Sequence, residues 1–198
     1  MTGAQHRVEA VDIVCASLPR SGSTMLYRAL AGLPPGSTTP QPQTGPVRKT
    51  HSFRPWEFAG VRAAVFIFGD PVSAVISTRA HRWDKGHFRN CGAGRRDPET
   101  TDIFREDALH YERMFNAWTQ PQTFALACVR YETLHDNADR LAAFLDVSLD
   151  LPPRRQRRDS SFVLGPGDFE AIHETYARLI RRVARAPDIA FWAPRTDA

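Results

Sequence analysis

The sequence VDIVCASLPRSGSTMLYRAL, residues 11–30, contains a strand, a tight loop and the start of a helix in direct succession. Val11–Leu18 is a short apolar run rich in β-branched residues and bounded by a proline, which is typical of a strand buried on both faces. Ser21–Ser23 then offers capping chemistry for a helix. Apolar residues follow at helical spacing: Met25, Leu26, Ala29, Leu30 and Leu33. This unit predicts an α/β fold.

The same succession of strand and helix recurs along the chain. Further strands are predicted at Val47–Thr50, Ala63–Phe68 and Thr123–Arg130. Asp70 fits the N-cap and Pro71 the first position of a helix that runs to about Arg82. Three more helices are predicted from apolar spacing, at Ile103–Thr119, from Leu134 to Leu145, and at Asp168–Val183. The alternation predicts a central parallel sheet flanked by helices.

Three segments lack either period and are predicted to be irregular loops, at about 33–46, 83–102 and 146–167. No internal repeat or linker separates the elements. We therefore expect one three-layer, P-loop-like α/β domain over residues 1–198.

Composition and charge limit the classes of function. The net charge is +4 and the pI about 9.3, which favours an anionic partner. The densest basic run, 154–158, is short and has no interleaved aromatic residues, so we expect no nucleic-acid partner. No apolar run reaches the roughly 18–20 residues of a membrane span, so no membrane partner is expected either. The polar N-terminus and an odd set of three cysteines predict a cytoplasmic protein with buried thiols.

Polar motifs follow four of the predicted strands, at 18–24, 49–51, 69–77 and 130–132. In open parallel sheets, ligands bind beyond the carboxyl ends of the strands. Because all four motifs leave the sheet at that edge, we expect them to form one site.

The first motif has the chemistry of an anion-binding loop, through Pro19, Arg20, Ser21, Gly22, Ser23 and Thr24. Backbone N–H groups at a helix N-terminus attract an anion, Gly22 allows close approach, and Arg20 adds a cation. An ordinary capped helix start explains the same residues. A nucleotide-kinase P-loop needs a lysine after its second glycine, and a dinucleotide fingerprint needs three glycines. The cysteine-phosphatase pattern needs five residues between its Cys and Arg, whereas four separate Cys15 from Arg20.

LPRSGSTML, residues 18–26, resembles the 5′-phosphosulfate loop of sulfotransferases that use 3′-phosphoadenosine 5′-phosphosulfate (PAPS), a family of P-loop-like α/β proteins. Lys49-Thr50-His51 is similar to the Lys-Thr-His of that family. The resemblance implies that His51 is the general base, and that Lys49 and Arg20 are catalytic cations. A histidine with an ordinary pKa near 6.5 suits the removal of a proton from a hydroxyl at neutral pH.

FIFGDPVSAVIS, residues 66–77, resembles the family's 3′-phosphate segment, in which Ser77 stands at the phosphate-binding serine. Gly69 replaces the family's arginine, a departure that removes a bidentate grip on phosphate. Arg79, Arg82 or the 154–158 run are candidates to replace it. Residues 129–134 resemble the family's Tyr-Glu-Asp-Leu region, and this resemblance implies that Tyr131 lies near the adenine. The family's C-terminal Arg-Lys-Gly element has no recognisable match, and Arg157 and Arg158 are candidates for its role.

The resemblance implies sulfuryl transfer from PAPS, as co-substrate, to a hydroxyl of a small-molecule or glycan acceptor. No metal is expected, since the spacing of His81, His87 and Cys91 fits no zinc pattern. Candidate acceptor-wall residues follow the second strand or lie in the long loop: Phe53, Trp56, Trp83, His87 and Phe88. Two alternatives remain: a P-loop small-molecule kinase that needs Mg²⁺, and a catalytically silent nucleotide-binding protein.

Overall fold

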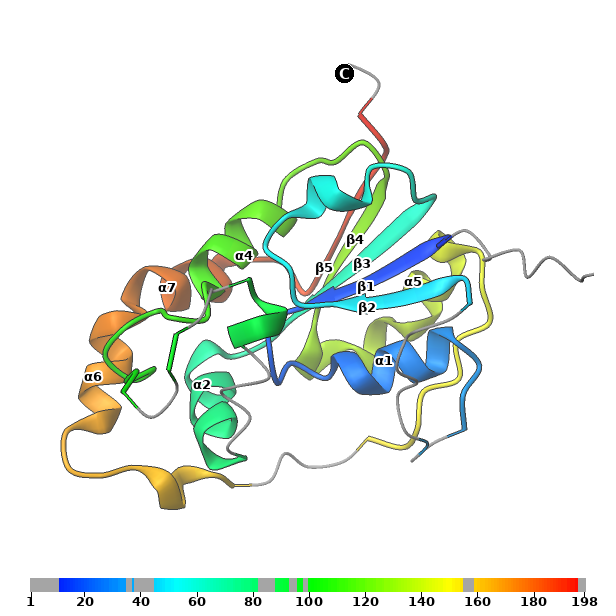
Figure 1. The fold of residues 1–198 in the computed structure, drawn as a ribbon. Coiled ribbons are helices and arrows are strands. Elements are labelled where there is room, and N and C mark those ends of the chain that lie inside the picture. Colours follow the sequence, from blue (N-terminus) through cyan, green and yellow to red (C-terminus); the bar gives the residue numbers. More distant parts are fainter. Residues whose placement is uncertain are drawn as a thin grey trace, which may run out of the picture.

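A computed structural model describes residues 11–34, 37, 45–81, 88–92, 96–97, 100–154 and 159–195 of the chain. A five-stranded sheet in the order β2-β1-β3-β4-β5 forms its centre (Figure 1). The strands are β1 (Ile13–Ser17), β2 (Val47–Thr50), β3 (Ala63–Phe68), β4 (Ala125–Arg130) and β5 (Ile189–Trp192). The first four are parallel and β5 is antiparallel to β4. Every residue of β1 and β3 is buried, which explains their continuous apolar sequences.

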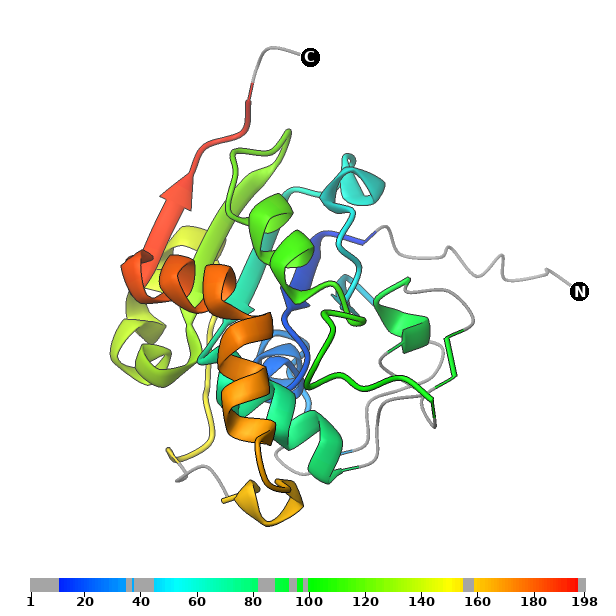
Figure 2. The same ribbon diagram turned by 90° about the vertical axis from the view of Figure 1, so that its left-hand side faces the viewer.

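Helices cover both faces of this sheet, as predicted. On one face lie α1 (Ser23–Leu30) and α5 (Ala138–Leu145), packed on one buried apolar cluster. On the other lie α2 (Pro71–Ala80), α4 (Tyr111–Trp118), α6 (Asp168–Thr175) and α7 (Ala177–Arg185), packed on a second cluster. In Figure 2, α6 and α7 (orange) follow one another in front of the sheet. Short 3₁₀ helices occur at η1 (Pro55–Phe58), η2 (Tyr131–Thr133), η3 (His135–Asn137) and η4 (Ser161–Val163). The described residues thus form a single α/β domain.

The helix predicted at Ile103–Thr119 begins eight residues late, at Tyr111, so its first half was predicted wrongly. Asp107 explains the boundary, because its carboxylate accepts hydrogen bonds from the backbone N–H groups of Tyr111 (2.8 Å) and Glu112 (2.9 Å). His110, at the N-cap, has a left-handed φ of 56° that ends any helix before it. The preceding turns still bury apolar side chains, as Phe104 and Ala108 show.

The C-terminal region differs from the prediction in two ways. The helix expected at Asp168–Val183 is divided at Tyr176, whose buried hydroxyl donates a 2.8 Å hydrogen bond to the carbonyl of Ile103. The edge strand β5 was not predicted, and it makes the sheet mostly rather than wholly parallel. Only four residues long and preceded by Pro187, β5 carries too little pattern to be recognised.

The strand order places the carboxyl ends of β1 and β3 at a point where the chain changes direction. From β1 the chain passes through α1 to β2 on one side, and then crosses to β3 on the other side of β1. Crevices at such switch points are the usual ligand sites of open α/β sheets. The loops after β1 and β3 leave the sheet there (Figure 1).

Candidate functional site

The loop between β1 and α1 has a backbone shaped by two left-handed residues, Arg20 (φ 64°) and Gly22 (φ 81°). Ser21 N–H closes a turn on the carbonyl of Leu18 at 3.3 Å. Gly22 is the N-cap, and its carbonyl accepts the first hydrogen bonds of the helix, from Met25 (3.0 Å) and Leu26 (3.2 Å). The N–H groups of the first helical turn therefore face the loop, as an anion site requires.

Two features of this loop fit a bound oxyanion. The Ser21 side chain is 1% exposed, and its hydroxyl has no hydrogen-bond partner within the described part of the chain. A buried hydroxyl without a partner is costly unless a ligand or water completes it. Gly22 allows close packing, because a Cβ there would lie 2.3 Å from Cδ2 of Tyr131. The loop and the Tyr131 ring, predicted to share the nucleotide site, are thus in direct contact.

Lys49, at the end of β2, points to the same loop. Its ammonium donates a 2.7 Å hydrogen bond to the hydroxyl of Thr24. Burial, together with the nearby charges of Arg28 and Arg20, holds the pKa of Lys49 below its ordinary value, although a Coulombic interaction with Cys15 acts in the other direction. Lys49 and Arg20 both lie near the N-terminal end of α1, whereas Arg28 is in the last turn of that helix. An anion bound at the loop would therefore offset the repulsion between Lys49 and Arg20.

His51 is buried beside the end of β1, with its ring nitrogen Nδ1 2.9 Å from the carbonyl oxygen of Ser17. A carbonyl only accepts hydrogen bonds, so Nδ1 carries the proton and, in the neutral ring, Nε2 carries the lone pair. The Ser17 hydroxyl lies 3.1 Å from the same Nδ1. Burial and then the charge of Lys49 lower the pKa of His51 to about 4, against the raising effect of the Ser17 carbonyl. The ring is therefore neutral at pH 7.

Arg20 joins the loop to α2. Its Nε donates a 3.0 Å hydrogen bond to the hydroxyl of Ser77, so two residues predicted to bind the nucleotide lie together. Its Nη2 lies 3.4 Å from Nε2 of His81, whose Nδ1 is 2.9 Å from the carbonyl of Ser77. Sequence reasoning considered His81 only as a metal ligand; its place one helical turn after Ser77 was the available signal. Pro19 contributes its carbonyl, which accepts a 3.5 Å hydrogen bond from Tyr111.

The ends of β3 and β4 have a different character. Gly69 lies against the carboxylate of Glu132, and a Cβ on this glycine would be 2.9 Å from Oε1. The same oxygen accepts a 3.1 Å hydrogen bond from the backbone N–H of Asp70, while Asp70 itself caps α2 through Ser73 N–H at 2.8 Å. Any side chain at position 69 would therefore displace Glu132. Arg154 reaches this edge, donating to the Glu132 carbonyl.

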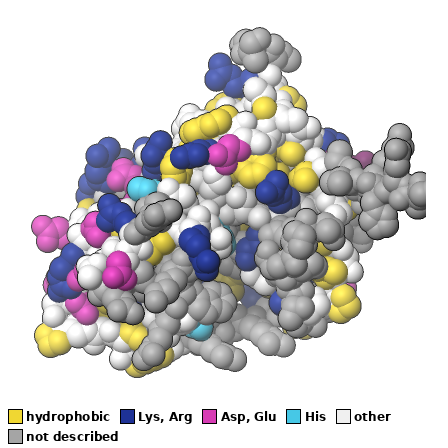
Figure 3. All heavy atoms as spheres, in the orientation of Figure 1, with side chains coloured by type: hydrophobic (Ala, Val, Ile, Leu, Met, Phe, Trp, Pro, Cys, Tyr) yellow, Lys and Arg dark blue, Asp and Glu magenta, His cyan; other side chains and the backbone are white. Residues whose placement is uncertain are grey.

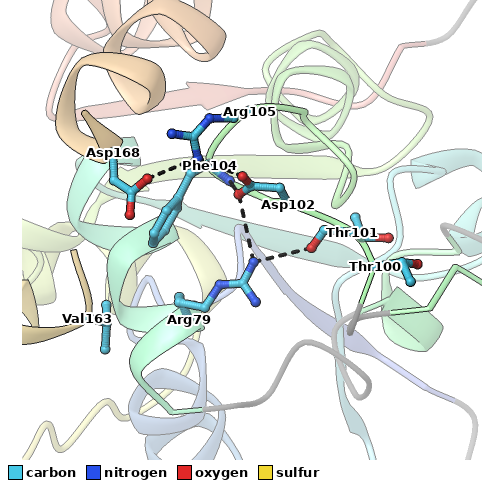
Figure 4. Close-up of a pocket in the computed structure, with 8 residues that line it drawn as sticks. All are labelled: Arg79, Thr100, Thr101, Asp102, Phe104, Arg105, Val163 and Asp168. Atoms are coloured by element: carbon cyan, nitrogen blue, oxygen red, sulfur yellow. Dashed lines mark hydrogen bonds and ion pairs between the residues drawn. The ribbon is translucent and has the colours of Figure 1, made fainter. Parts of the chain in front are cut away.

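Among the other candidates for a phosphate grip, Arg79 is placed elsewhere. It lines a polar cavity of about 360 Å³ between α2, the 100–105 turns and α6 (Figure 4). Its guanidinium donates to the carbonyl of Thr101 at 3.3 Å, lies 3.9 Å from Asp102 and stacks over Phe104 at 5.5 Å. Arg105 bridges Asp102 (2.7 Å) and Asp168 (3.0 Å) in the same cavity. This ion-pair cluster ties the turns to α2 and α6. Arg82, Arg157 and Arg158 lie outside the described residues.

The predicted acceptor-wall residues separate into groups. Phe53 and Phe88 are buried, at 3% and 1% exposure, and belong to the core, whereas Trp56 is exposed. Trp83 and His87 lie outside the described residues. Cys91, weighed earlier with His81 and His87 as a metal ligand, is a buried free thiol, as are the other two cysteines. The described ranges hold no group of three or more His, Cys, Asp or Glu side chains arranged for a metal.

Comparison with known proteins gives no family assignment. No protein-family model matches this chain, and no curated protein does either. None of the helices in the described ranges has both the length and the apolar character needed to cross a membrane.

Proposed function

We propose that this protein is a sulfotransferase that transfers the sulfuryl group of PAPS to a hydroxyl of a small-molecule or glycan acceptor. One observation carries the proposal. β1 and β2 are paired, so three features lie at one edge of the sheet: the loop after β1, the ammonium of Lys49 at the end of β2, and the Nε2 lone pair of His51 just beyond β2. A base next to an anion loop suits group transfer better than simple binding.

In this mechanism His51 removes the acceptor proton through Nε2, while the Ser17 carbonyl holds the proton on Nδ1. The acceptor oxygen forms a bond to sulfur as the bond from sulfur to the 5′-phosphate oxygen breaks. Arg20, Lys49, Ser23, Thr24 and the loop N–H groups stabilise the negative charge that develops on the departing phosphate. PAPS supplies the activated sulfuryl group.

The low pKa of His51 is consistent with this role once a charged donor is considered. Burial and then the charge of Lys49 lower the pKa to about 4. A donor anion beside Lys49 offsets the second of these two causes and so raises the pKa of His51, while burial, the larger cause, continues to hold it down. Proton removal is thus favoured after the donor binds.

The sulfotransferases that this chain resembles have an arginine at the position of Gly69. Among the described residues, Arg154 is best placed to take over the role of that arginine. It contacts the Glu132 carbonyl and lies 3.5 Å from Asp136, at the edge where the 3′ end of the nucleotide is expected. Its side chain is 57% exposed and hence accessible to a ligand.

A second candidate function is that of a catalytically silent nucleotide-binding protein, which the Glu132 carboxylate at Gly69 favours because it repels a 3′-phosphate. A screen with radiolabelled PAPS against phenols, aliphatic alcohols and sugars separates the two. Label transferred to an acceptor supports the sulfotransferase. Saturable binding of 3′,5′-bisphosphoadenosine without transfer to any acceptor supports the silent protein. Tighter binding of ATP with Mg²⁺ than of the bisphosphate supports a kinase.

A further inference from the structure

A cavity of about 310 Å³ lies between α4 and α7, above β3, β4 and β5. None of the residues that line it belongs to the loop at 18–24 or to Lys49 and His51. Its walls are mainly apolar and aromatic, with Phe68 and Phe115 in edge contact at 5.3 Å, and with Trp192 and Ala190 from β5. The volume is at the lower end of the range for small-molecule pockets, about 300–1,000 Å³, and suits a ligand of one or two rings.

The cavity has a cationic rim. Arg182 and Arg185, in the last turn of α7, line it and are exposed. Among the described residues neither forms an ion pair, and the lining contains no Asp or Glu. Over the end of the molecule that carries α7, Figure 3 shows Lys and Arg side chains interleaved with Asp and Glu side chains. The lining of the cavity, by contrast, contributes only basic charge. The charge at this rim is therefore available to an anion.

Arg130 prevents the end of α7 from repelling that anion. The C-terminus of a helix carries a partial negative charge on its last carbonyls. Here Arg130 donates hydrogen bonds to the carbonyls of Val183 (2.7 Å) and Ala186 (2.8 Å), and it pairs with Asp188 at 2.9 Å. Arg130 thus satisfies two of the carbonyls at the helix end and pairs with Asp188, which reduces the negative charge beside Arg182 and Arg185.

Cys128, in the wall of the cavity, indicates binding rather than reaction there. Its thiol is 3.2 Å from the carbonyl of Trp118, and burial raises its pKa well above the ordinary value. The thiolate is the reactive form of cysteine, so Cys128 behaves as an apolar wall group.

We propose that this cavity binds a small aromatic acid, a flat one- or two-ring system that carries one carboxylate or sulfonate. The rings contact the aromatic walls, and the acid group pairs with Arg182 and Arg185, whose planar guanidinium groups match its geometry. This second site does not depend on the proposed transferase activity.

The test uses the full chain and naphthalene-2-sulfonate as probe, with Trp192 as a nearby fluorophore. We expect saturable binding by calorimetry and tryptophan fluorescence, and little binding of uncharged 2-naphthol. The double variant Arg182→Gln, Arg185→Gln should bind the sulfonate at least about tenfold more weakly, because two charge-assisted contacts are lost. Arg181→Gln, an exposed arginine on the same helix that does not line the cavity, is the matched control and should bind normally.

A second variant tests the cavity itself. Ala190→Leu fills it with a branched side chain and should abolish binding, with thermal unfolding recorded to confirm that the variant folds. Equal binding by the double-arginine variant and the wild type would overturn the proposal. So would displacement of the sulfonate by saturating 3′,5′-bisphosphoadenosine, which would place the probe on the loop at 18–24. Self-association that quenches Trp192 in the wild type and is lost in Ala190→Leu would also overturn it, by showing that a second copy of the chain occupies the cavity.

Discussion

The two halves of the sheet's carboxyl edge differ in charge. At the ends of β1 and β2, the loop N–H groups, Arg20 and Lys49 converge near a buried Ser21 hydroxyl without a described partner. At the ends of β3 and β4, the carboxylate of Glu132 fills the space beside Gly69 and accepts from the backbone of Asp70. One edge therefore combines a half suited to an anion with a half that repels one. Substitutions in the first half and substitutions in the second half should therefore affect different steps of the proposed reaction.

The largest expected effect comes from the base in the cationic half. His51→Ala should lower the turnover of sulfuryl transfer by roughly 10²–10⁴-fold, because no ring nitrogen remains to take the proton from the hydroxyl of the acceptor. Binding of 3′,5′-bisphosphoadenosine should persist. The assay is transfer of radiolabelled sulfate to the best acceptor from the screen, with His173→Ala, an exposed histidine on α6, as control. Turnover within a few-fold of wild type in His51→Ala would remove the base from the mechanism.

The same histidine should make the fold sensitive to acid. The pKa of His51 is about 4 in the folded chain and near 6.5 when unfolded, so the unfolded state binds the proton more tightly. Stability is thus complete above pH 6.5 and is lost as the pH falls toward 4, by about 2 kcal/mol between pH 7 and 5.

Urea unfolding of the wild type and of His51→Gln at pH 7 and pH 5 gives the loss of unfolding free energy between the two pH values. The contribution of His51 is the difference between the losses of the two proteins. His173→Gln, the control, should lose as much unfolding free energy between the two pH values as the wild type does. Parallel losses in His51→Gln and the wild type would show that His51 is not held neutral by the fold.

Gly22→Ala tests the close contact between the two halves through Tyr131. A left-handed alanine costs about 1–2 kcal/mol of unfolding free energy, and the new Cβ must displace the Tyr131 ring. Bisphosphate binding should weaken about tenfold, since the loop and ring both shift. Gly32→Ala is a matched control, because Gly32 also has a positive φ, of 63°, but nothing lies within 4 Å of its Cβ position. Equal binding losses in the two variants would mean that strain alone, and not the Tyr131 contact, acts on the site.

The smallest effect concerns the acidic half. Glu132→Gln keeps an oxygen for the Asp70 N–H but removes the charge, so 3′,5′-bisphosphoadenosine should bind roughly two- to fivefold more tightly. The gain should shrink for adenosine 5′-phosphate, which lacks the 3′-phosphate. Glu170→Gln, an exposed acid on α6, controls for net charge. Weaker bisphosphate binding in Glu132→Gln would show that this carboxylate supports the nucleotide.

The sequence predicted correctly those elements that depend only on residues close to one another along the chain. The apolar runs of β1 and β3 and the Asp70 cap of α2 were predicted and are confirmed. The start of α4 was missed because a side chain four residues earlier, Asp107, caps it after turns that bury apolar residues at helical spacing.

The candidate site shows the same limit. The sequence indicated that Arg20, Lys49, His51 and Ser77 lie at or beyond the carboxyl ends of strands, and the order of the strands brings these ends to one edge. The sequence placed Glu132 in one of the four polar motifs, but its contact with Gly69 was missed because it joins residues 63 positions apart, on adjacent strand ends. From the sequence, Gly69 is only a missing arginine; in the fold it makes room for a carboxylate.

The anion site for the 5′ end of a nucleotide, between β1 and β2, can be tested without an acceptor, by titration calorimetry with 3′,5′-bisphosphoadenosine. We expect saturable one-to-one binding to the wild type, and at least about tenfold weaker binding to Lys49→Met, which removes the cation that contacts Thr24. Arg62→Met, at the opposite end of the sheet, should bind as the wild type does. No saturable binding to the wild type, or equal binding to Lys49→Met, would show that this loop is not a nucleotide site.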